Sequence, residues 1–520
     1  MKLRNLAVVF CAASALLAAC SSDDDSGNNG GGGVGGKNTA GTSGKAGATS
    51  TAGKGGGAGV GAAAGAAGET GNGETAGEGG SGGNGEGGEG GASPLSEQFT
   101  VTLENIAPNK PFASAGVFDT PVGDLAAGPA TPGKTYKFTV DAGRKQKLFF
   151  ATMLGATNDV FFAPSGEGIP LYLDNGTPIT ADVTAQVYLW DAGTEINEEP
   201  FVGLNTVTKQ VTTNTGAIDT NTKVRKVSTV TEGFVYAYPA VASLIKVTVT
   251  HTTGTLFDVT IDDLSTAALT TGDLVSHPVP LSPGVWTVSS GTNVLFADQM
   301  PVPPHGLEAL AEDGKPATLA TYLAANAGIT YPASPGVWLL HESGTKPLFT
   351  AGAADLGKGL EAVAEDGNPS LLGANRTSLE GYRDGAVFNT PVGATAPGPI
   401  VPGSKYQFTF TASPGDSLSF ASMLAATNDV FLGPQDSGIP LFDANGVALT
   451  GDISDRVYLW DAGTEANEKP GIGPNTVTNQ LAVNTGADGE GKVQLLSAVA
   501  TDTYDYPSAQ AVLKVTIAKK

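Results

Sequence analysis

The chain has 520 residues, and its 51 acidic residues outnumber its 28 lysines and arginines, which gives a net charge of −23. A protein this acidic lacks the basic surface that nucleic-acid binding needs, so the charge argues against DNA or RNA as a partner. The length leaves room for two or three domains.

Residues 1–19 have the features of a lipoprotein signal peptide. Lys2 and Arg4 form a positive start, and the apolar stretch Leu6–Leu17 is too short to remain as a membrane span. Residues 17–20 (Leu-Ala-Ala-Cys) resemble a bacterial lipobox, in which the cysteine becomes the lipid-bearing first residue of the mature protein. We therefore expect lipidation at Cys20 and a lipid-anchored position in the bacterial cell envelope, at the outer membrane or cell surface. The alternative is an ordinary cleaved signal with an incidental cysteine.

Residues 20–95 are mainly Gly, Ala, Ser, Thr and acidic residues, with almost no large apolar side chains. Such a segment cannot bury enough apolar surface to offset the entropy lost on ordering, so we expect a disordered tether. The two cysteines of the chain are Cys11, which leaves with the signal, and Cys20. No disulfide is therefore expected in the exported protein.

The remainder of the chain carries a long internal repeat. The segment Val187–Glu195 (VYLWDAGTE) recurs unchanged at Val457–Glu465, and the offset of 270 residues also relates Thr157–Phe161 to Thr427–Phe431. A constant offset predicts one module used twice. We place the two modules at residues 99–250 and 381–519.

Within each module, short runs alternate apolar and polar residues, as in Phe99–Leu103, Tyr136–Val140 and Tyr406–Phe410. This period of two predicts half-buried strands, and the frequent prolines and glycines between the runs predict turns. The predicted fold class is all-β, with two antiparallel β-sandwiches.

A second, smaller repeat lies between the modules, over residues 255–380. Ser282–Trp286 (SPGVW) returns as Ser334–Trp338, and Gly306–Gly314 returns as Gly359–Gly367 with one Leu-to-Val change. Each unit predicts a strand with a tryptophan followed by a short amphipathic helix.

The strand-like run Phe257–Asp262, just before these units, resembles the opening strand of the first module. We therefore predict that the second module begins near Thr255, with the two small units inserted after its first strand. A separate middle domain is the alternative.

Two acidic loops are candidates for a metal site. Asp191 and Glu195 flank Gly193 directly after an apolar strand, and Asp159 lies just before another apolar run. Calcium and similar hard cations need several oxygen ligands held without strict geometry, and these three acids supply an incomplete set that water would complete. The alternative is that they are solvated turn residues.

Two motifs of the modules resemble the spondin N-terminal domain. They are Phe149–Leu154 with Thr157-Asn158-Asp159, and Leu189–Glu195 with its Trp-Asp-Ala-Gly-Thr-acid pattern. The resemblance covers most of both modules. It implies a β-sandwich related to calcium-dependent membrane-binding modules, with a divalent cation held in loops at one end. In the animal members of that family the role is adhesion to matrix or cell-surface receptors.

Carried over position by position, the resemblance implies three metal ligands in each module: Asp159, Asp191 and Glu195 in the first, and Asp429, Asp461 and Glu465 in the second. The animal pattern ends this motif in aspartate where the present chain has glutamate. The implied cofactor is calcium, with a structural or a functional role. The implied partner is a cell-surface or matrix protein or a glycan.

Catalytic patterns are weak. The four histidines (His251, His277, His305 and His341) fall outside the matched blocks and lack metal-ligand spacing. The carboxylates of Asp191 and Glu195 suggest glycoside hydrolysis, but two acids on one turn rarely flank a sugar ring. Trp190 and Trp460 end apolar strands and are expected in the core. We therefore expect calcium-dependent binding or adhesion and no enzyme. The alternatives are a structural envelope protein without a specific ligand and a carbohydrate-active enzyme.

Overall fold

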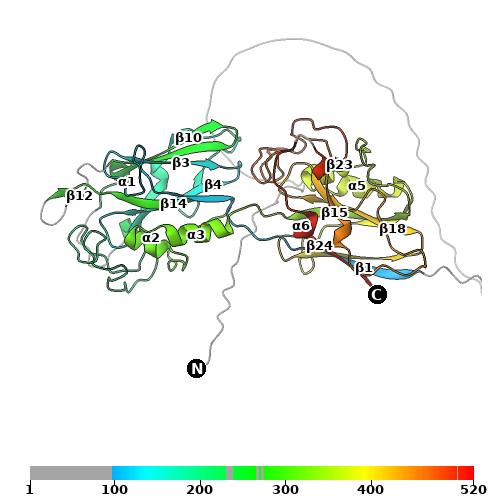
Figure 1. The fold of residues 1–520 in the computed structure, drawn as a ribbon, viewed down its shortest axis with the longest axis horizontal. Coiled ribbons are helices and arrows are strands. Elements are labelled where there is room, and N and C mark those ends of the chain that lie inside the picture. The colour runs from blue at the N-terminus through cyan, green and yellow to red at the C-terminus, as the bar shows by residue number, and fades with distance from the viewer. Residues whose placement is uncertain (1–95, 230–237, 265–268, 271–274, 500–501) are drawn as a thin grey trace, which may run out of the picture. The chain divides into compact units, whose positions relative to one another are not determined.

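The computed structural model describes residues 96–229, 238–264, 269–270, 275–499 and 502–520 (Figure 1). The expected signal peptide, the expected tether and Cys20 lie outside these residues. The described part is rich in antiparallel strands with a few short helices, which confirms the all-β class. None of its helices is long and apolar enough to cross a membrane.

The first sandwich packs a smaller sheet against a larger one. The smaller sheet has the order β3 (Thr135–Asp141), β11 (Leu256–Asp263), β10 (Ile245–Thr253) and β7 (Ala181–Asp182). The larger sheet has the order β2 (Ser114–Phe118), β14 (Leu281–Ser289), β4 (Lys147–Leu154), β5 (Val160–Pro164), β8 (Val187–Asp191) and β9 (Arg225–Lys226), with β6 (Ile169–Pro170) paired to β4. The other elements are α1 (Val241–Leu244), α2 (Leu307–Asp313), α3 (Ala317–Asn326), the 3-10 turns Thr184–Gln186 and Val227–Thr229, and the ribbon of β12 (Leu269–Thr270) and β13 (Ser276–His277).

The second sandwich has the same design. Its smaller sheet has the order β17 (Lys405–Ala412), β1 (Glu97–Asn105), β24 (Leu513–Lys519) and β21 (Gly451–Asp452). Its larger sheet has the order β16 (Tyr382–Phe388), β15 (Ala333–Glu342), β18 (Asp416–Leu424), β19 (Val430–Gly433), β22 (Tyr458–Asp461) and β23 (Gln494–Leu495), with β20 (Ile439–Pro440) paired to β18. The helices are α4 (Leu360–Asp366), α5 (Ser370–Asn375) and α6 (Ala509–Val512), with 3-10 turns at Arg376–Ser378, Ser454–Arg456 and Leu496–Ala498.

Each sandwich has two apolar layers. One lies between its sheets, where strands such as β1 and β3 bury alternate residues. The other lies between the larger sheet and the short helices, where Trp190 and Trp460 are each 1% exposed. Their indole N–H groups donate to the carbonyls of Ala163 and Pro434. The expected core position of both tryptophans is confirmed.

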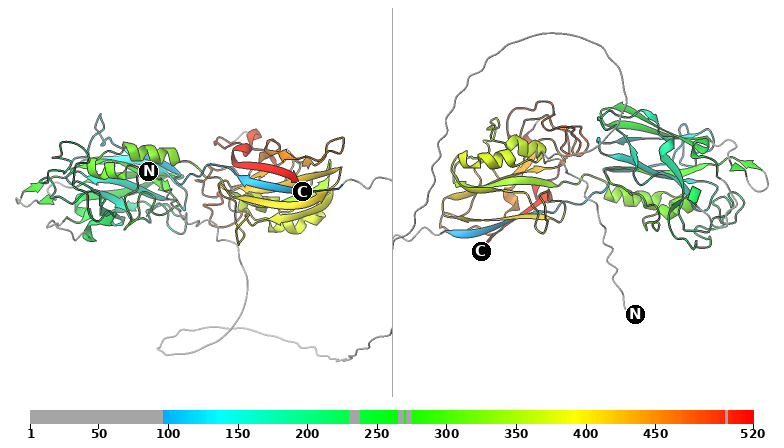
Figure 2. Two further views of the ribbon diagram at one scale, coloured as in Figure 1. Left: turned by 90° about the horizontal axis from the view of Figure 1, so that it is seen from below. Right: turned by 180° about the vertical axis from the view of Figure 1, so that it is seen from behind.

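The opening strands of the two modules are exchanged. β1 lies between β17 and β24 of the second sandwich, with Phe99 opposite Phe410, whereas β11 lies between β3 and β10 of the first, with Phe257 opposite Val140 (Figure 2). This corrects the boundaries expected from the sequence, which gave β1 to the first module and β11 to the second. The physical reason is the tight turn at Gly254, whose φ of +56° suits glycine. It lets β11 pair with β10 at a small loop-closure cost, whereas β1 in the same place would close a loop of about 30 residues to β3 and of about 140 residues to β10.

The two small repeat units are divided between the sandwiches. β14 lies between β2 and β4, and β15 lies between β16 and β18. The helices of each unit cover the sheet that its strand joins. The segment 255–380 therefore forms no separate middle domain, and the first sandwich is inserted in the chain between β1 and β15 of the second.

The exchange predicts opposite effects for two equivalent substitutions. Phe99 and Phe257 are both fully buried, so replacing either with alanine should cost about 3–5 kcal/mol through lost burial and a cavity. Phe99→Ala should reduce amide hydrogen-exchange protection in β17 and β24, and Phe257→Ala should reduce it in β3 and β10. Loss of protection in β3 on Phe99→Ala would contradict the exchanged pairing.

Candidate cation-binding loops

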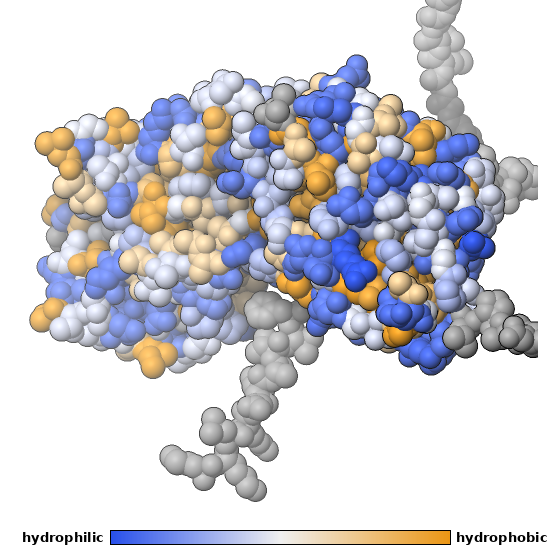
Figure 3. All heavy atoms as spheres, turned by 45° about the vertical axis from the view of Figure 1, so that its right-hand side comes forward, coloured by the Kyte–Doolittle hydropathy of each residue, from blue (hydrophilic) through white to orange (hydrophobic). Residues whose placement is uncertain are grey.

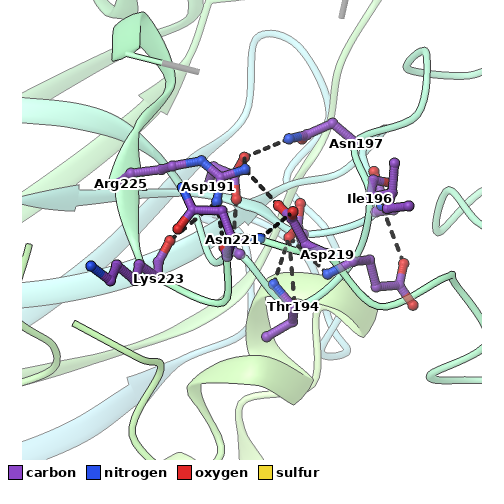
Figure 4. A network of polar contacts seen from close by, with 12 residues as sticks. Asp191, Thr194, Ile196, Asn197, Asp219, Asn221, Lys223 and Arg225 are labelled. Carbon is purple, nitrogen blue, oxygen red and sulfur yellow. Dashed lines mark hydrogen bonds and ion pairs between the residues drawn. The ribbon is translucent and has the colours of Figure 1, made fainter. Parts of the chain in front are cut away.

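The predicted acidic residues come together at one edge of each larger sheet. Asp159 directly precedes β5, Asp191 ends β8, and the two strands pair with Val160 opposite Asp191. Since the strands are antiparallel, the start of one and the end of the other share an edge. The second sandwich repeats the arrangement, with Val430 opposite Asp461. The structure therefore brings both predicted aspartates of each module to neighbouring loops. Figure 4 shows Asp191 and its partners in the first module.

The aspartate of the Thr-Asn-Asp motif is completely buried in both modules. Asp159 Oδ2 accepts hydrogen bonds from the backbone N–H groups of Thr194 and Glu195, each at 3.2 Å. Its Oδ1 has no hydrogen-bond partner among the described residues, and the same is true of Asp429 Oδ1. Burial, and then the charge of the neighbouring aspartate, raise the pKa of both carboxyls well above the usual range. At this position each module thus holds a buried carboxylate oxygen without a hydrogen-bond partner among the described residues.

The second aspartate closes its own tight turn. Asp191 Oδ1 accepts from the N–H of Gly193 at 2.6 Å, and its Oδ2 accepts from Asn197 Nδ2 at 2.5 Å. Gly193 has φ +67°, and a Cβ there would lie 2.5 Å from a backbone carbonyl, so this turn requires glycine. Asp461 has the equivalent bonds from Gly463 and Asn467. The predicted tight bend at the glycine is present in both modules.

The predicted glutamate ligands have both oxygens engaged in holding loops. Glu195 Oε1 accepts from the N–H of Gly216 at 2.7 Å, and Oε2 accepts from Asn158 Nδ2 at 3.2 Å. Glu465 has the same bonds from Gly486 and Asn428. The structure therefore places these glutamates as bridges between two loops, and a cation would have to share oxygens that are already in use.

A fourth acid from the small repeat was missed by the sequence reasoning. Glu312 on α2 and Glu365 on α4 are each 2% exposed and lie near the loop glutamates. Burial raises the pKa of both to about 7, and the charges of neighbouring carboxylates add to the rise. The available signal was the run Ala-Glu-Asp-Gly, identical in both units, although an amphipathic helix explains it equally well.

Arg225 was also missed, and it distinguishes the first module from the second. It stands opposite Asp191 in the pairing of β8 with β9. Its Nη2 lies 3.0 Å from Asp191 Oδ2 and 2.6 Å from Asp219 Oδ2, and all three side chains are at most 4% exposed (Figure 4). The corresponding position opposite Asp461 is Gln494. The loop before β23 is one residue shorter than the loop before β9, so the 270-residue offset no longer holds there. An alignment at that offset therefore does not place Gln494 opposite Arg225.

The geometry limits what these loops can do chemically. No three His, Cys, Asp or Glu side chains within the described ranges gather closely enough to hold a metal ion. A cation at these loops would therefore need amide, backbone or water oxygens in addition to the carboxylates, which calcium accepts. The unpartnered Oδ1 atoms of Asp159 and Asp429 are the positions that such an ion would satisfy.

Comparison with known proteins adds no assignment: no protein-family model matches the chain, and no curated protein matches it. A functional interpretation therefore depends on the chemistry of these loops and on the motifs themselves.

The link that Glu465 forms between two loops predicts that Gly486 tolerates substitution poorly. A Cβ at Gly486 would lie 2.2 Å from the carboxyl carbon of Glu465, so Gly486→Ala should push that side chain away and break its bonds. We expect a loss of about 1–3 kcal/mol in the free energy of unfolding, measured by chemical denaturation. Gly398→Ala is the control, because a Cβ there meets nothing within 4 Å. Equal losses in the two variants would contradict the bridging role.

The buried Glu312 predicts a dependence of stability on pH. Its folded pKa of about 7 exceeds the ordinary value of 4.5, so the folded chain holds this proton more tightly than the unfolded chain. The resulting stabilisation of the fold is complete below the pKa of Glu312 in the unfolded chain. It is lost as the pH rises through the pKa of Glu312 in the folded chain. The glutamine in Glu312→Gln is neutral at every pH. Between pH 5 and pH 8 the free energy of unfolding of this variant, measured by urea unfolding, should therefore rise by about 2 kcal/mol relative to that of the parent. Glu167→Gln, at a side chain 75% exposed, is the control. A constant difference across this range would refute the prediction.

Proposed function

We propose that the chain is a lipid-anchored cell-envelope protein that uses two spondin-like sandwiches for calcium-dependent binding or adhesion. One observation carries the proposal: the same fully buried aspartate, Asp159 in one sandwich and Asp429 in the other, has a carboxylate oxygen that no described residue hydrogen-bonds. Leaving a buried polar oxygen unsatisfied is costly, and a bound divalent cation would favour the ionised carboxylate and satisfy that oxygen. In this role calcium fixes the loops, and a cell-surface or matrix protein or a glycan is the partner.

The surface beside the acidic loop of the first sandwich supports a contact role. The connection from β8 to β9 exposes Leu204, Val211 and Ile218, which are 78%, 97% and 78% exposed. A ligand that covers these three side chains would bury apolar surface beside the acidic loop. On the face shown in Figure 3, apolar and polar residues are intermixed.

Anchoring and duplication fit the same role. The lipobox at Cys20 and the Gly-rich composition of residues 20–95 support attachment to a membrane through a long tether. Two binding modules on one tether gain avidity through effective concentration, without any new contact.

Hydrolysis is a poorer fit to the loops. Both oxygens of Asp191 and of Glu195 accept hydrogen bonds that hold the loops, which leaves neither carboxylate placed to act on a substrate. A purely structural envelope protein is the remaining alternative, and the following experiment separates it from a binding protein.

Calcium should raise the melting temperature of the full-length chain. Saturation at about one hundred times the dissociation constant corresponds to about 2.7 kcal/mol. Asp191→Asn combined with Asp461→Asn should lose this shift and also calcium-dependent binding to glycan and matrix-protein arrays. Asp174→Asn combined with Asp455→Asn changes two exposed aspartates and should behave like the parent. A chain that neither takes up calcium nor melts higher with it would end the calcium proposal. Calcium uptake without any array ligand would favour the structural alternative.

A further inference from the structure

The second sandwich contains a fully buried histidine at the end of its larger sheet that lies away from the acidic loops. His341 is 0% exposed on β15, where it stands opposite Ser417 near the start of β18. Asp429 follows the other end of β18, so the histidine and the acidic loop belong to opposite ends of that strand. In the first sandwich the equivalent position, opposite Lys147, is Ser289. The histidine is therefore a feature of the second sandwich, and the proposed calcium dependence makes no use of it.

The imidazole of His341 takes the place of a phenyl ring in the first sandwich. A Cβ at Gly168 of the first sandwich would lie 2.5 Å from the ring of Phe149. A Cβ at the equivalent Gly438 of the second would lie 2.5 Å from His341 Nε2. Where the first sandwich has Phe149, the second has Ser419. The ring and the small hydroxyl side chain have thus exchanged neighbouring strands, which conserves core volume but places a titratable group where the first sandwich has an apolar one.

The hydrogen bonds of the ring fit the neutral form of the histidine. His341 Nδ1 lies 3.1 Å from the carbonyl oxygen of Glu342 and 2.9 Å from Thr345 Oγ1. Because a carbonyl oxygen can only accept, Nδ1 carries the proton and Nε2 accepts from the Ser419 hydroxyl at 2.9 Å. Within the described part of the chain Ser419 Oγ makes no other hydrogen bond. A second proton, on Nε2, would therefore leave this buried hydroxyl proton without an acceptor.

Protonation would also bury a positive charge that no described carboxylate hydrogen-bonds. The charged residues on the elements around the ring are Glu342 and Lys346 at the end of β15 and after it, Glu380, Arg383 and Asp384 on β16 and before it, Asp416 on β18, and Asp436 before β20. The carboxylate of Asp416 is bound to Arg383 Nε at 2.7 Å, and that of Glu380 accepts from the N–H of Lys346 at 3.2 Å. Burial outweighs the attraction of Asp416 and Glu380 for the charged ring, so the pKa of His341 lies below its ordinary value.

We propose that His341 is an acid-sensitive switch: its protonation opens the end of the larger sheet where β15, β18 and β20 meet, and the first sandwich stays closed. The charged ring is stable only where water reaches it, so acid favours the open form. The stabilisation that the neutral ring gives is complete above the pKa of histidine in the open chain, which is about 6.5. It is lost as the pH falls from there toward the lower pKa in the folded chain. A chain held outside the cell, as proposed above, would in this way respond to the acidity of its surroundings.

Amide hydrogen exchange of the full-length chain, measured by mass spectrometry at pH 7.5 and pH 5, tests the proposal. After correction for the intrinsic exchange rate at each pH, protection of β15, β18 and β20 should fall about tenfold or more at pH 5. Protection of the equivalent strands of the first sandwich, β14, β4 and β6, should not fall. The buried Glu312 and Glu365 occur at equivalent places, so their response to pH is shared by the two sandwiches. No loss in the second sandwich, or an equal loss in both, would overturn the proposal.

Variants identify the histidine as the cause of the acid response. His341→Ser combined with Ser419→Phe installs the pair of the first sandwich and should abolish the loss of protection at pH 5, as should His341→Gln. His305→Gln, at a half-buried histidine of the first sandwich, should retain it. An acid response that persists in His341→Gln would refute the proposal.

A direct titration decides even if these variants fail to fold, as judged by circular dichroism. The imidazole signal of His341 in the folded parent, followed by NMR, should titrate below pH 6.5, and a pKa at or above that value would contradict the switch. Neither measurement involves calcium, so failure of this inference and failure of the proposed function are distinguishable.

Discussion

The short hairpin between β10 and β11 is the constraint on which the arrangement of the whole chain depends. Its turn at Gly254 holds β11 beside β10, so the two strands pair across a very short loop with little loss of chain entropy. Once β11 fills the place between β3 and β10, β1 can complete a sheet only beside β24 and β17. The units that follow are then divided in order, β14 to the first sandwich and β15 to the second. One tight turn thus determines which copy each repeated segment completes.

The features of the fold that could be predicted from the sequence are those encoded by neighbouring residues. Alternation predicted the strands, and their apolar surroundings predicted that Trp190 and Trp460 are buried. The partner of β1 could not be predicted in this way, because Phe99–Leu103 and Phe257–Ile261 have the same alternation and suit either sheet. Chain connectivity makes that choice, and a local pattern contains no information about it.

In the candidate site, too, the locally encoded residues could be predicted and the residues brought in from distant segments could not. Asp159 and Asp191 were found because each adjoins a recognisable strand and recurs in both modules. Arg225 and Glu312 could not be found, because Arg225 lies on a strand that follows a loop of unequal length and Glu312 lies on a helix far along the chain. The acids were therefore predictable, whereas the groups that set their charge and pKa were not. Since a cation site depends on that balance, identical motifs in the two modules do not guarantee identical chemistry.

The position of β1 also orders events during synthesis. β1 leaves the ribosome early, but its neighbours β17 and β24 follow only after roughly 300 and 400 further residues. The first sandwich has all its strands and helices by Asn326 and can fold while translation continues. The second must wait for the last strand of the chain, and until then β1 is an unpaired amphipathic strand of the kind that aggregates. A chain that terminates before β24 would therefore contain one folded sandwich and one incomplete sandwich with exposed strand edges. Pairing of β1 with β24 thus distinguishes complete chains from truncated ones.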